Sequence, residues 1–136
     1  MKLYFAYGAN LSKDSMAFRC PAAVPFSKFE LHDWALDFNT HATIKPKKGS
    51  RVPGALWRIT SDCEQSLDMF EGYPSYYDKT ILEQDGLEFM VYVMNEPNYR
   101  AAPSGGYISL IQQGYLDWNL DESRLFRAVD QKYDFC

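Results

Sequence analysis

Cysteine is scarce in this chain. Its three cysteines, Cys20, Cys63 and Cys136, are odd in number and widely separated, and no two of them have the spacing of metal ligands. The sequence therefore predicts neither a disulfide framework nor a metal site. Because free thiols are typical of proteins in a reducing compartment, we expect a cytoplasmic location.

An excess of positive charge is also missing. The chain has 14 Lys and Arg residues against 18 Asp and Glu residues, which gives a net charge of −4. Proteins that bind nucleic acid normally present a basic surface to the phosphates, so we expect no nucleic-acid partner.

Long hydrophobic runs and nucleotide motifs are missing as well. Gly8, Asn10 and Lys13 interrupt the apolar N-terminal residues before a signal-peptide core or a membrane span could form, so we expect no membrane partner. The sequence contains no Gly-x-Gly-x-x-Gly motif and no phosphate-binding lysine loop, and we expect no cofactor.

The sequence does contain enough apolar material for one folded unit. Of its 136 residues, 46% are hydrophobic and 16% are aromatic. A chain of this length buries roughly two thirds of its extended surface without metals or disulfides. Neither a repeat nor a Pro/Gly/Ser-rich linker divides it. We therefore expect residues 1–136 to form a single domain.

Local patterns predict both strands and helices. A capping box at Ser61–Glu64 begins a helix, which Gly72 and Pro74 must end. The Asp85-Gly86 turn joins two apolar runs into a hairpin. The basic run Lys45–Arg51 is typical of a solvated loop. The predicted strands cover residues 4–7, 29–38, 52–60, 77–82 and 87–94, and the predicted helices cover 11–19, 61–71, 107–118 and a last segment after 121.

Candidate binding groups follow the first predicted strand, where Tyr7 leads into Gly8, Ala9 and Asn10. A strand that ends in such small residues leaves backbone N–H groups without ladder partners, and these groups form a pocket for a carboxylate or a phosphate. Gly8 tolerates a positive φ, and Ala9 lets a ligand approach the backbone closely. An ordinary turn is the alternative interpretation of the same residues.

Glu71 is the candidate acid or base. It lies at the predicted C-terminus of a helix, against the negative end of the helix dipole. The aromatic neighbours Phe70, Tyr73, Tyr76 and Tyr77 reduce its solvation. Both effects raise the pKa of the Glu71 carboxyl group, which suits a group that accepts one proton and donates another near neutral pH. The alternative is a helix-end residue in solvent.

Other polar aromatic residues are less specific. Tyr92 and Tyr107 carry phenols that could hydrogen-bond a substrate, although tyrosines more often fill a core. His32 and His41 have no partner at the spacing of a metal site or a nucleophile, which favours a structural role for both.

Several blocks along the chain form an ordered set. The first reads Tyr7-Gly8-Ala9-Asn10-Leu11. The later blocks are Arg19-Cys20-Pro21-Ala22, Ala42-Thr43-Ile44-Lys45-Pro46, Val52-Pro53-Gly54-Ala55-Leu56-Trp57, Leu67-Asp68-Met69-Phe70-Glu71-Gly72-Tyr73-Pro74, then Tyr92, Tyr107 and Gln113-Gly114-Tyr115. In this order they resemble the gamma-glutamylcyclotransferase-like (AIG2-like) superfamily. Members of that family open with Tyr-Gly-Ser-Asn-Leu at a strand end, so Ala9 departs from the family pattern.

The resemblance implies an α+β fold, a small mixed β-barrel flanked by helices, with a deep pocket. It also implies a cofactor-independent gamma-glutamyl cyclotransferase, in which the α-amine of a gamma-glutamyl amide attacks the γ-carbonyl and releases 5-oxoproline and a free amine or amino acid. The acid/base group would be Glu71. The substrate-binding residues would be Tyr7, Gly8, Ala9, Asn10, Leu11, Tyr92 and Tyr107.

Two further interpretations fit the same residues. One is a non-catalytic module that keeps the pocket to bind a small carboxylate or the terminus of a partner protein. The other is a different acyl reaction on the same scaffold, such as the opening of a gamma-glutamylamine. The leaving group would extend toward the predicted loops at residues 45–51 and 95–106, and its identity stays open, as does the oligomeric state.

Overall fold

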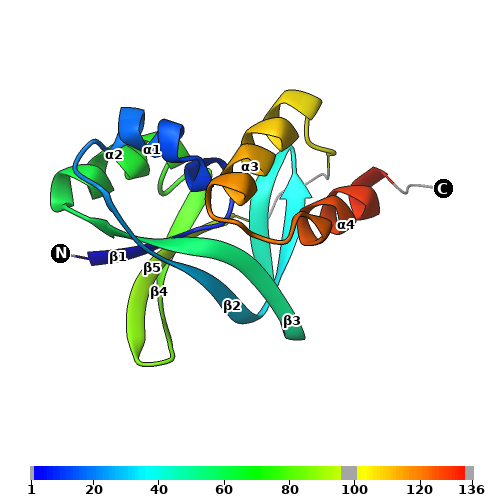
Figure 1. The fold of residues 1–136 in the computed structure, drawn as a ribbon, viewed down its shortest axis with the longest axis horizontal. Coiled ribbons are helices and arrows are strands. Elements are labelled where there is room, and N and C mark those ends of the chain that lie inside the picture. Colours follow the sequence, from blue (N-terminus) through cyan, green and yellow to red (C-terminus); the bar gives the residue numbers. More distant parts are fainter. Residues whose placement is uncertain (1, 96–100, 134–136) are drawn as a thin grey trace.

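A mixed five-stranded sheet is the centre of the fold (Figure 1). The computed structural model describes residues 2–95 and 101–133, so Cys136 and part of the predicted 95–106 loop lie outside the described residues. The strands are β1 (Lys2–Ala6), β2 (Val24–Asn39), β3 (His41–Ile59), β4 (Tyr77–Gln84) and β5 (Leu87–Met94). Their order is β2-β3-β1-β5-β4, with β1 antiparallel to β3 and parallel to β5. The N-terminal strand therefore lies in the middle of the sheet.

Helices gather near the end of this central strand. Within the described residues they are the 3₁₀ turn η1 (Ala9–Leu11), α1 (Lys13–Arg19), α2 (Ser61–Glu71), α3 (Gly105–Asp117) and α4 (Glu122–Tyr133). In Figure 1, α1, α2 and α3 lie on one side of the molecule, the β4–β5 hairpin projects toward the opposite side, and α4 lies near the end of the β2–β3 ribbon. Residues 2–95 and 101–133 include no helix with the length and apolar character of a membrane span.

The α+β class, with helices flanking a mixed sheet, is confirmed, but the sheet is not closed into a barrel. β2 and β4 are its two edges. One side chain bridges them: Gln84 accepts a hydrogen bond from the His32 N–H at 2.9 Å and donates one to the Glu30 carbonyl at 2.8 Å. The pairing register of β2 shifts between His32 and Trp34, and such a bulge bends a strand. A side-chain bridge therefore stands where a barrel would have a backbone ladder.

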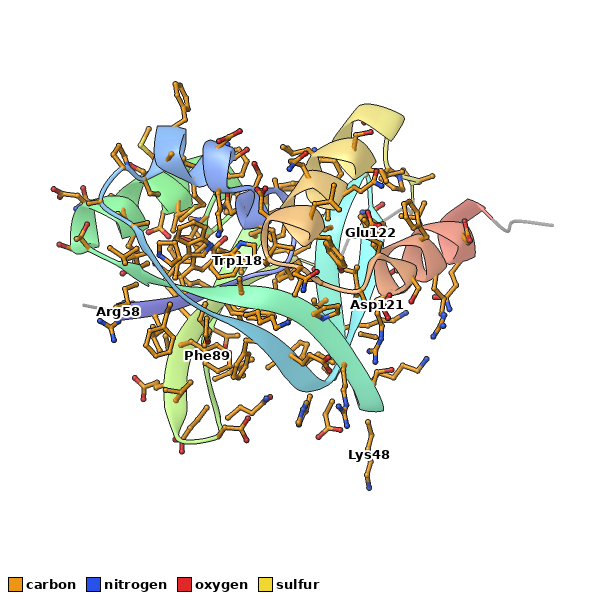
Figure 2. All side chains as sticks on the ribbon, viewed as in Figure 1. Lys48, Arg58, Phe89, Trp118, Asp121 and Glu122 are labelled. Carbon is orange, nitrogen blue, oxygen red and sulfur yellow. The ribbon has the colours of Figure 1, made fainter. Side chains whose placement is uncertain are left out.

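The predicted loop at Lys45–Arg51 is wrong, because these residues belong to the 19-residue strand β3. Pairing with β2 places Pro46 opposite Trp34 and Arg51 opposite His32, so residues 47–50 form a bulge opposite Asp33 within the strand. Figure 2 shows Lys48, which lies partway along β3, pointing away from the body of the molecule.

Other predicted elements are confirmed with small changes. The helix predicted from Ser61 exists, but its N-cap is Thr60, whose hydroxyl accepts from the Cys63 N–H at 3.1 Å. It ends as predicted at Gly72, which has φ 66°. The 84–86 hairpin turn is also present between β4 and β5. The helix predicted over 11–19 is divided at Ser12, because that residue caps α1 and η1 precedes it.

The two faces of the central strand have different chemistry. Successive side chains of a strand point to opposite faces. On one face Phe5 is fully buried, with its ring 5.9 Å from that of Phe29 and 6.0 Å from that of Phe89. On the other face the Tyr4 ring lies 5.8 Å from the Tyr92 ring, edge to face. The face with Phe5 packs into the apolar core, whereas the face with Tyr4 borders a cavity.

Candidate active site

A cavity of about 160 Å³ lies where β1, α2 and α3 come together. It brings together Glu71 and six of the seven residues predicted to bind substrate: Tyr7, Gly8, Ala9, Asn10, Tyr92 and Tyr107. Leu11 is the exception. Its side chain is fully buried in the core, it is not part of the cavity lining, and its N–H donates to the Gly8 carbonyl at 3.0 Å.

The backbone after Tyr7 forms a 3₁₀ turn that closes on itself. The Leu11 N–H donates to the Gly8 carbonyl at 3.0 Å, and the Ser12 N–H donates to the Ala9 carbonyl at 3.3 Å. This pattern gives the N–H groups of Ala9 and Asn10 no acceptor within the turn, as at any helix start. Both residues line the cavity, so two backbone donors are available to an anion there.

Gly8 has a different role from the one expected. Its φ is −124°, so the turn does not use the tolerance of glycine for a positive φ. The glycine instead permits a close approach: a Cβ at this position would lie 3.3 Å from the Ala42 Cβ and 3.5 Å from the Tyr107 hydroxyl oxygen. The missing side chain leaves room for β3 and α3 to meet the turn.

Helix α3 fixes the turn from behind. A Cβ on Gly114 would lie 2.4 Å from the Leu11 Cβ and 2.9 Å from the Ser12 nitrogen, so only glycine permits this contact. The Trp118 indole N–H donates to the Leu11 carbonyl at 2.9 Å, and Asp117 accepts from the Lys13 N–H at 2.9 Å. Figure 2 shows Trp118 beneath α1 and beside α3. The turn is thus fixed by contacts from more than 100 positions along the chain.

The Asn10 side chain connects a cation with a phenol. Asn10 is buried, with 2% of its surface exposed. The Arg19 guanidinium donates to the Asn10 Oδ1, and the Asn10 Nδ2 donates to the Tyr4 Oη at 3.0 Å. Arg19 also lies over the Phe70 ring, 3.4 Å from its centroid. This chain of contacts runs from α1 through the turn to β1.

Glu71 is the last residue of α2 and points into the cavity lining. Burial raises the pKa of its carboxyl group to about 7, and the positive charge of Arg19 opposes that rise. The expectation of a raised pKa is therefore confirmed, with desolvation as its main cause. A carboxyl group with this pKa exchanges protons readily near neutral pH.

Three of the six tyrosines that line the cavity donate their hydroxyl hydrogens to other groups of the protein. Tyr7 donates to the Tyr92 carbonyl at 2.6 Å, and Tyr77 donates to the Ala42 carbonyl. Tyr92 donates to the Asp68 carboxylate at 2.6 Å. Tyr107 differs, because its hydroxyl oxygen accepts from the Ala42 N–H at 2.9 Å. The tyrosines therefore do not offer equivalent groups to a ligand.

Some residues at the site were not expected from the sequence. His41 was interpreted as structural, yet it lines the cavity with its Nδ1 2.8 Å from the Tyr76 hydroxyl oxygen. Tyr4 and Asp68 were not singled out at all. Asp68 stands three residues before Glu71, the spacing of neighbours on one helix face, and this spacing was the available signal. No sequence signal near Tyr4 indicates a role in the site, because its hydrogen-bond partner Asn10 lies beyond the strand, in the turn.

A metal centre finds no support in the part of the chain that the structure describes. Within residues 2–95 and 101–133, no three His, Cys, Asp or Glu side chains are grouped closely enough to hold an ion. The cavity is lined by the Glu71 carboxyl group, by the backbone N–H groups of Ala9 and Asn10, and by several tyrosine side chains. Such a set can bind a carboxylate and move a proton beside it.

Comparison with known proteins assigns the chain to a family. The family model described as gamma-glutamyl cyclotransferase, AIG2-like matches residues 4–114, which include every element of the site. The chain therefore belongs to the AIG2-like gamma-glutamyl cyclotransferase family.

Individual relatives agree with this assignment. A gamma-glutamylcyclotransferase of Bos taurus is 32% identical over 74% of this chain and 62% of its own length. The gamma-glutamylcyclotransferase of Homo sapiens is 32% identical over 82% of this chain and 69% of its own length. A solved structure named gamma-glutamyl cyclotransferase superposes with a TM-score of 0.82 at 28% identity, covering 93% of this chain and 85% of that one. The chain spans less than two thirds of the length of the bovine relative.

Proposed function

We propose that this protein is a gamma-glutamyl cyclotransferase that converts a gamma-glutamyl amide into 5-oxoproline and a free amine or amino acid. The observation that carries the proposal is the joining, in one cavity, of a carboxyl group whose pKa is raised to about 7 with the unpaired backbone donors of Ala9 and Asn10. Family membership and the named relatives support the same reaction.

In this proposal the turn holds the glutamyl end of the substrate. The N–H groups of Ala9 and Asn10 bind the α-carboxylate, and Tyr7 anchors the turn to β5 through the Tyr92 carbonyl. The Tyr107 hydroxyl, which stands against Gly8, donates to the same carboxylate. Fixing this end folds the flexible chain so that its α-amine faces its own γ-carbonyl. Well-oriented intramolecular reactions reach effective molarities of about 10⁵ M or more.

Glu71 then moves the protons. The α-nitrogen forms a bond to the γ-carbon, and the bond from that carbon to the leaving nitrogen breaks. Of the three protons on the α-ammonium group, one stays on the lactam nitrogen and two reach the departing nitrogen, which leaves as an ammonium ion. Glu71 takes protons from one nitrogen and gives them to the other, so it ends the cycle as it began. No covalent bond to the protein is required.

Ala9 stands where the family has serine and removes one hydroxyl from the cradle. The backbone donor of Ala9 is unaffected by this change. We expect the loss to weaken substrate binding by about 1 kcal/mol, the net value of one hydrogen bond.

We also propose that residues 1–136 act as one domain on a small molecule in the cytoplasm. Support for the reducing compartment comes from Cys20 and Cys63, which are both buried and free. The Cys20 thiol lies 3.6 Å from the Cys63 carbonyl rather than in a disulfide.

The decisive experiment is a substrate panel. The purified protein is incubated with gamma-glutamyl amino acids, gamma-glutamyl amines and glutathione, and 5-oxoproline is measured by mass spectrometry. We expect release with at least one member, and its identity will define the leaving group. Glu71→Gln should abolish that release, while Glu88→Gln, which changes an exposed carboxylate on β5, should not.

Calorimetry separates the enzyme from a binding module. A gamma-glutamyl amide that binds the wild-type protein tightly, without any 5-oxoproline appearing across the panel, would contradict the proposed reaction and establish the non-catalytic alternative. Release that continues in Glu71→Gln would instead leave the activity in place and remove Glu71 from it.

A further inference from the structure

The hydrogen atoms of the cavity phenols are assigned by their partners. A backbone carbonyl and a carboxylate can only accept, so Tyr7, Tyr77 and Tyr92 must each donate their single hydroxyl hydrogen to the protein. None of these three has a hydrogen left for a substrate. A backbone N–H can only donate, so the Tyr107 oxygen must accept from Ala42, and its own hydrogen has no acceptor within residues 2–95 and 101–133.

The partners of Asn10 determine the role of the Tyr4 hydroxyl in the same way. A guanidinium has no acceptor, so the atom of Asn10 that faces Arg19 must be the amide oxygen. The other end of the amide, Nδ2, therefore faces Tyr4 and donates to its hydroxyl oxygen. The Tyr4 hydroxyl accepts this bond, and among the described residues no acceptor takes its hydrogen. Tyr4 is 4% exposed and lines the cavity, so that hydrogen is buried and available there.

Tyr107 and Tyr4 stand at different places in the cavity lining. The Tyr107 oxygen lies 3.5 Å from the position of a Cβ on Gly8, beside the turn that cradles the α-carboxylate. Tyr4 lies against Asn10 and the Arg19 guanidinium, and the charge of Glu71 adds to the burial that raises the pKa of the Tyr4 hydroxyl. That hydroxyl stays protonated at every physiological pH and lines the same cavity as Glu71.

We propose, on the basis of the cyclotransferase function above, that the Tyr4 hydroxyl donates a hydrogen bond to the γ-carbonyl oxygen as negative charge develops on it. Attack by the α-nitrogen moves an electron pair of the carbonyl onto this oxygen, and its collapse expels the leaving nitrogen. A donor fixed at that point stabilises the transition state more than the substrate.

Arg19 and Asn10 are the positioning residues of this donor. The cation polarises the amide, and the amide polarises the phenol, so each hydrogen bond in the chain strengthens the next. The chain also prevents the Tyr4 hydroxyl from rotating toward another acceptor. Tyr4 acts on the reacting atoms, and the other two act through Tyr4.

Tyr4→Phe tests the assignment, because it removes one oxygen and keeps the ring contact with Tyr92. We expect kcat to fall about 10²- to 10³-fold, the usual effect of removing one oxyanion donor, while KM changes less than about 3-fold. Tyr115→Phe is the matched control: Tyr115 is buried, its hydroxyl has no partner among the described residues, and it does not line the cavity. Its kcat should equal that of the wild type.

Replacement of Tyr4 by 3-fluorotyrosine gives a second measurement that a purely structural role would not change. Fluorine makes the phenol a stronger donor while keeping its shape close to that of tyrosine, and we expect a higher kcat. If Tyr4→Phe does not fold, as judged by circular dichroism and the melting temperature, the fluorinated protein decides alone, and an unchanged or lower kcat overturns the assignment.

The outcomes separate this inference from the function on which it rests. Suppose that the wild-type protein is active and that Tyr4→Phe keeps kcat within about 3-fold or only raises KM. This result overturns the role of Tyr4 and leaves the cyclotransferase function in place. A wild-type protein that releases no 5-oxoproline from any substrate of the panel overturns both.

Discussion

The two ends of helix α2 carry the same side chain in opposite surroundings. Near its start, Glu64 accepts hydrogen bonds from Lys2 at 2.8 Å and Lys79 at 2.7 Å, and these bonds lower the pKa of its carboxyl group. At its end, Glu71 faces the cavity, and burial raises the pKa of its carboxyl group to about 7. The comparison shows that the neighbours of two glutamates seven residues apart on one helix shift the pKa values of their carboxyl groups in opposite directions.

The pH dependence of activity should show the largest effect. We expect kcat/KM to fall about tenfold per pH unit below pH 7, as Glu71 becomes protonated and cannot accept a proton. Arg19→Gln should move this acidic limb of the pH profile, the fall in kcat/KM, to higher pH, because the Arg19 charge lowers the pKa of Glu71. Glutamine can still donate to Asn10. Glu64→Gln should leave the limb in place, and a shift in that variant would break the comparison.

The Glu71 carboxylate should destabilise the folded protein as pH rises, whereas a carboxylate in an ion pair stabilises it. The pKa of Glu71 is near 4.5 in the unfolded chain and about 7 in the folded one, so the cost of its charge appears as pH rises from 4.5 to 7 and is complete above 7. Glu71→Gln should therefore stabilise the protein at pH 8 by about 2 kcal/mol and have no such effect at pH 4. Urea unfolding at the two pH values measures this difference, and equal stabilisation at both would contradict it.

Gly72 sets where α2 ends and so where Glu71 points. Its φ of 66° is left-handed, and a Cβ there would lie 3.1 Å from the Tyr76 Cβ. Gly72→Ala should cost about 1–2 kcal/mol of stability and also reduce activity. Gly86→Ala is the control, because Gly86 has φ 78° in the distant β4–β5 turn. That variant should lose similar stability by thermal unfolding while its kcat stays at the wild-type value.

Glu64→Gln should have the smallest effect. The pKa of Glu64 is lowered in the folded state, so its contribution is present above pH 4.5 and is lost as pH falls through the folded-state value. We expect a loss of about 0.5–1 kcal/mol at pH 7, which salt should reduce. Denaturant unfolding at low and high ionic strength checks this. A loss as large as the gain in Glu71→Gln would show that the two ends of α2 are more alike than their contacts indicate.

Much of the fold was predictable because its signals are local. The hydroxyl cap, predicted at Ser61 and found at Thr60, the stop at Gly72 and the Asp85-Gly86 turn act through nearby backbone, and each element appears within a residue or two of its predicted place. The strand at Lys45–Arg51 was missed because its cause is not local. Its residues have no strand pattern of their own, and the pairing with β2 on both sides of the 47–50 bulge continues the strand through them.

The sequence likewise predicted part of the candidate site. The turn at Gly8 and the acid at Glu71 each carry a local signal, and the structure brings both to one cavity. The partners that give each phenol its role were not predictable. Asp68 reaches Tyr92 across 24 positions and Ala42 reaches Tyr107 across 65, and no period in the sequence links such pairs.

The sequence by itself determined the order of elements, the small turn after β1 and the placing of a carboxyl group at a helix end, because these depend on backbone preference and on neighbours within one turn of the chain. The tertiary structure alone decided which hydroxyl hydrogens are free, where Arg19 acts and why Gly114 must be glycine. Those features depend on the polarity and distance of groups that only folding brings together, and a hydrogen bond has no direction until both of its partners are in place.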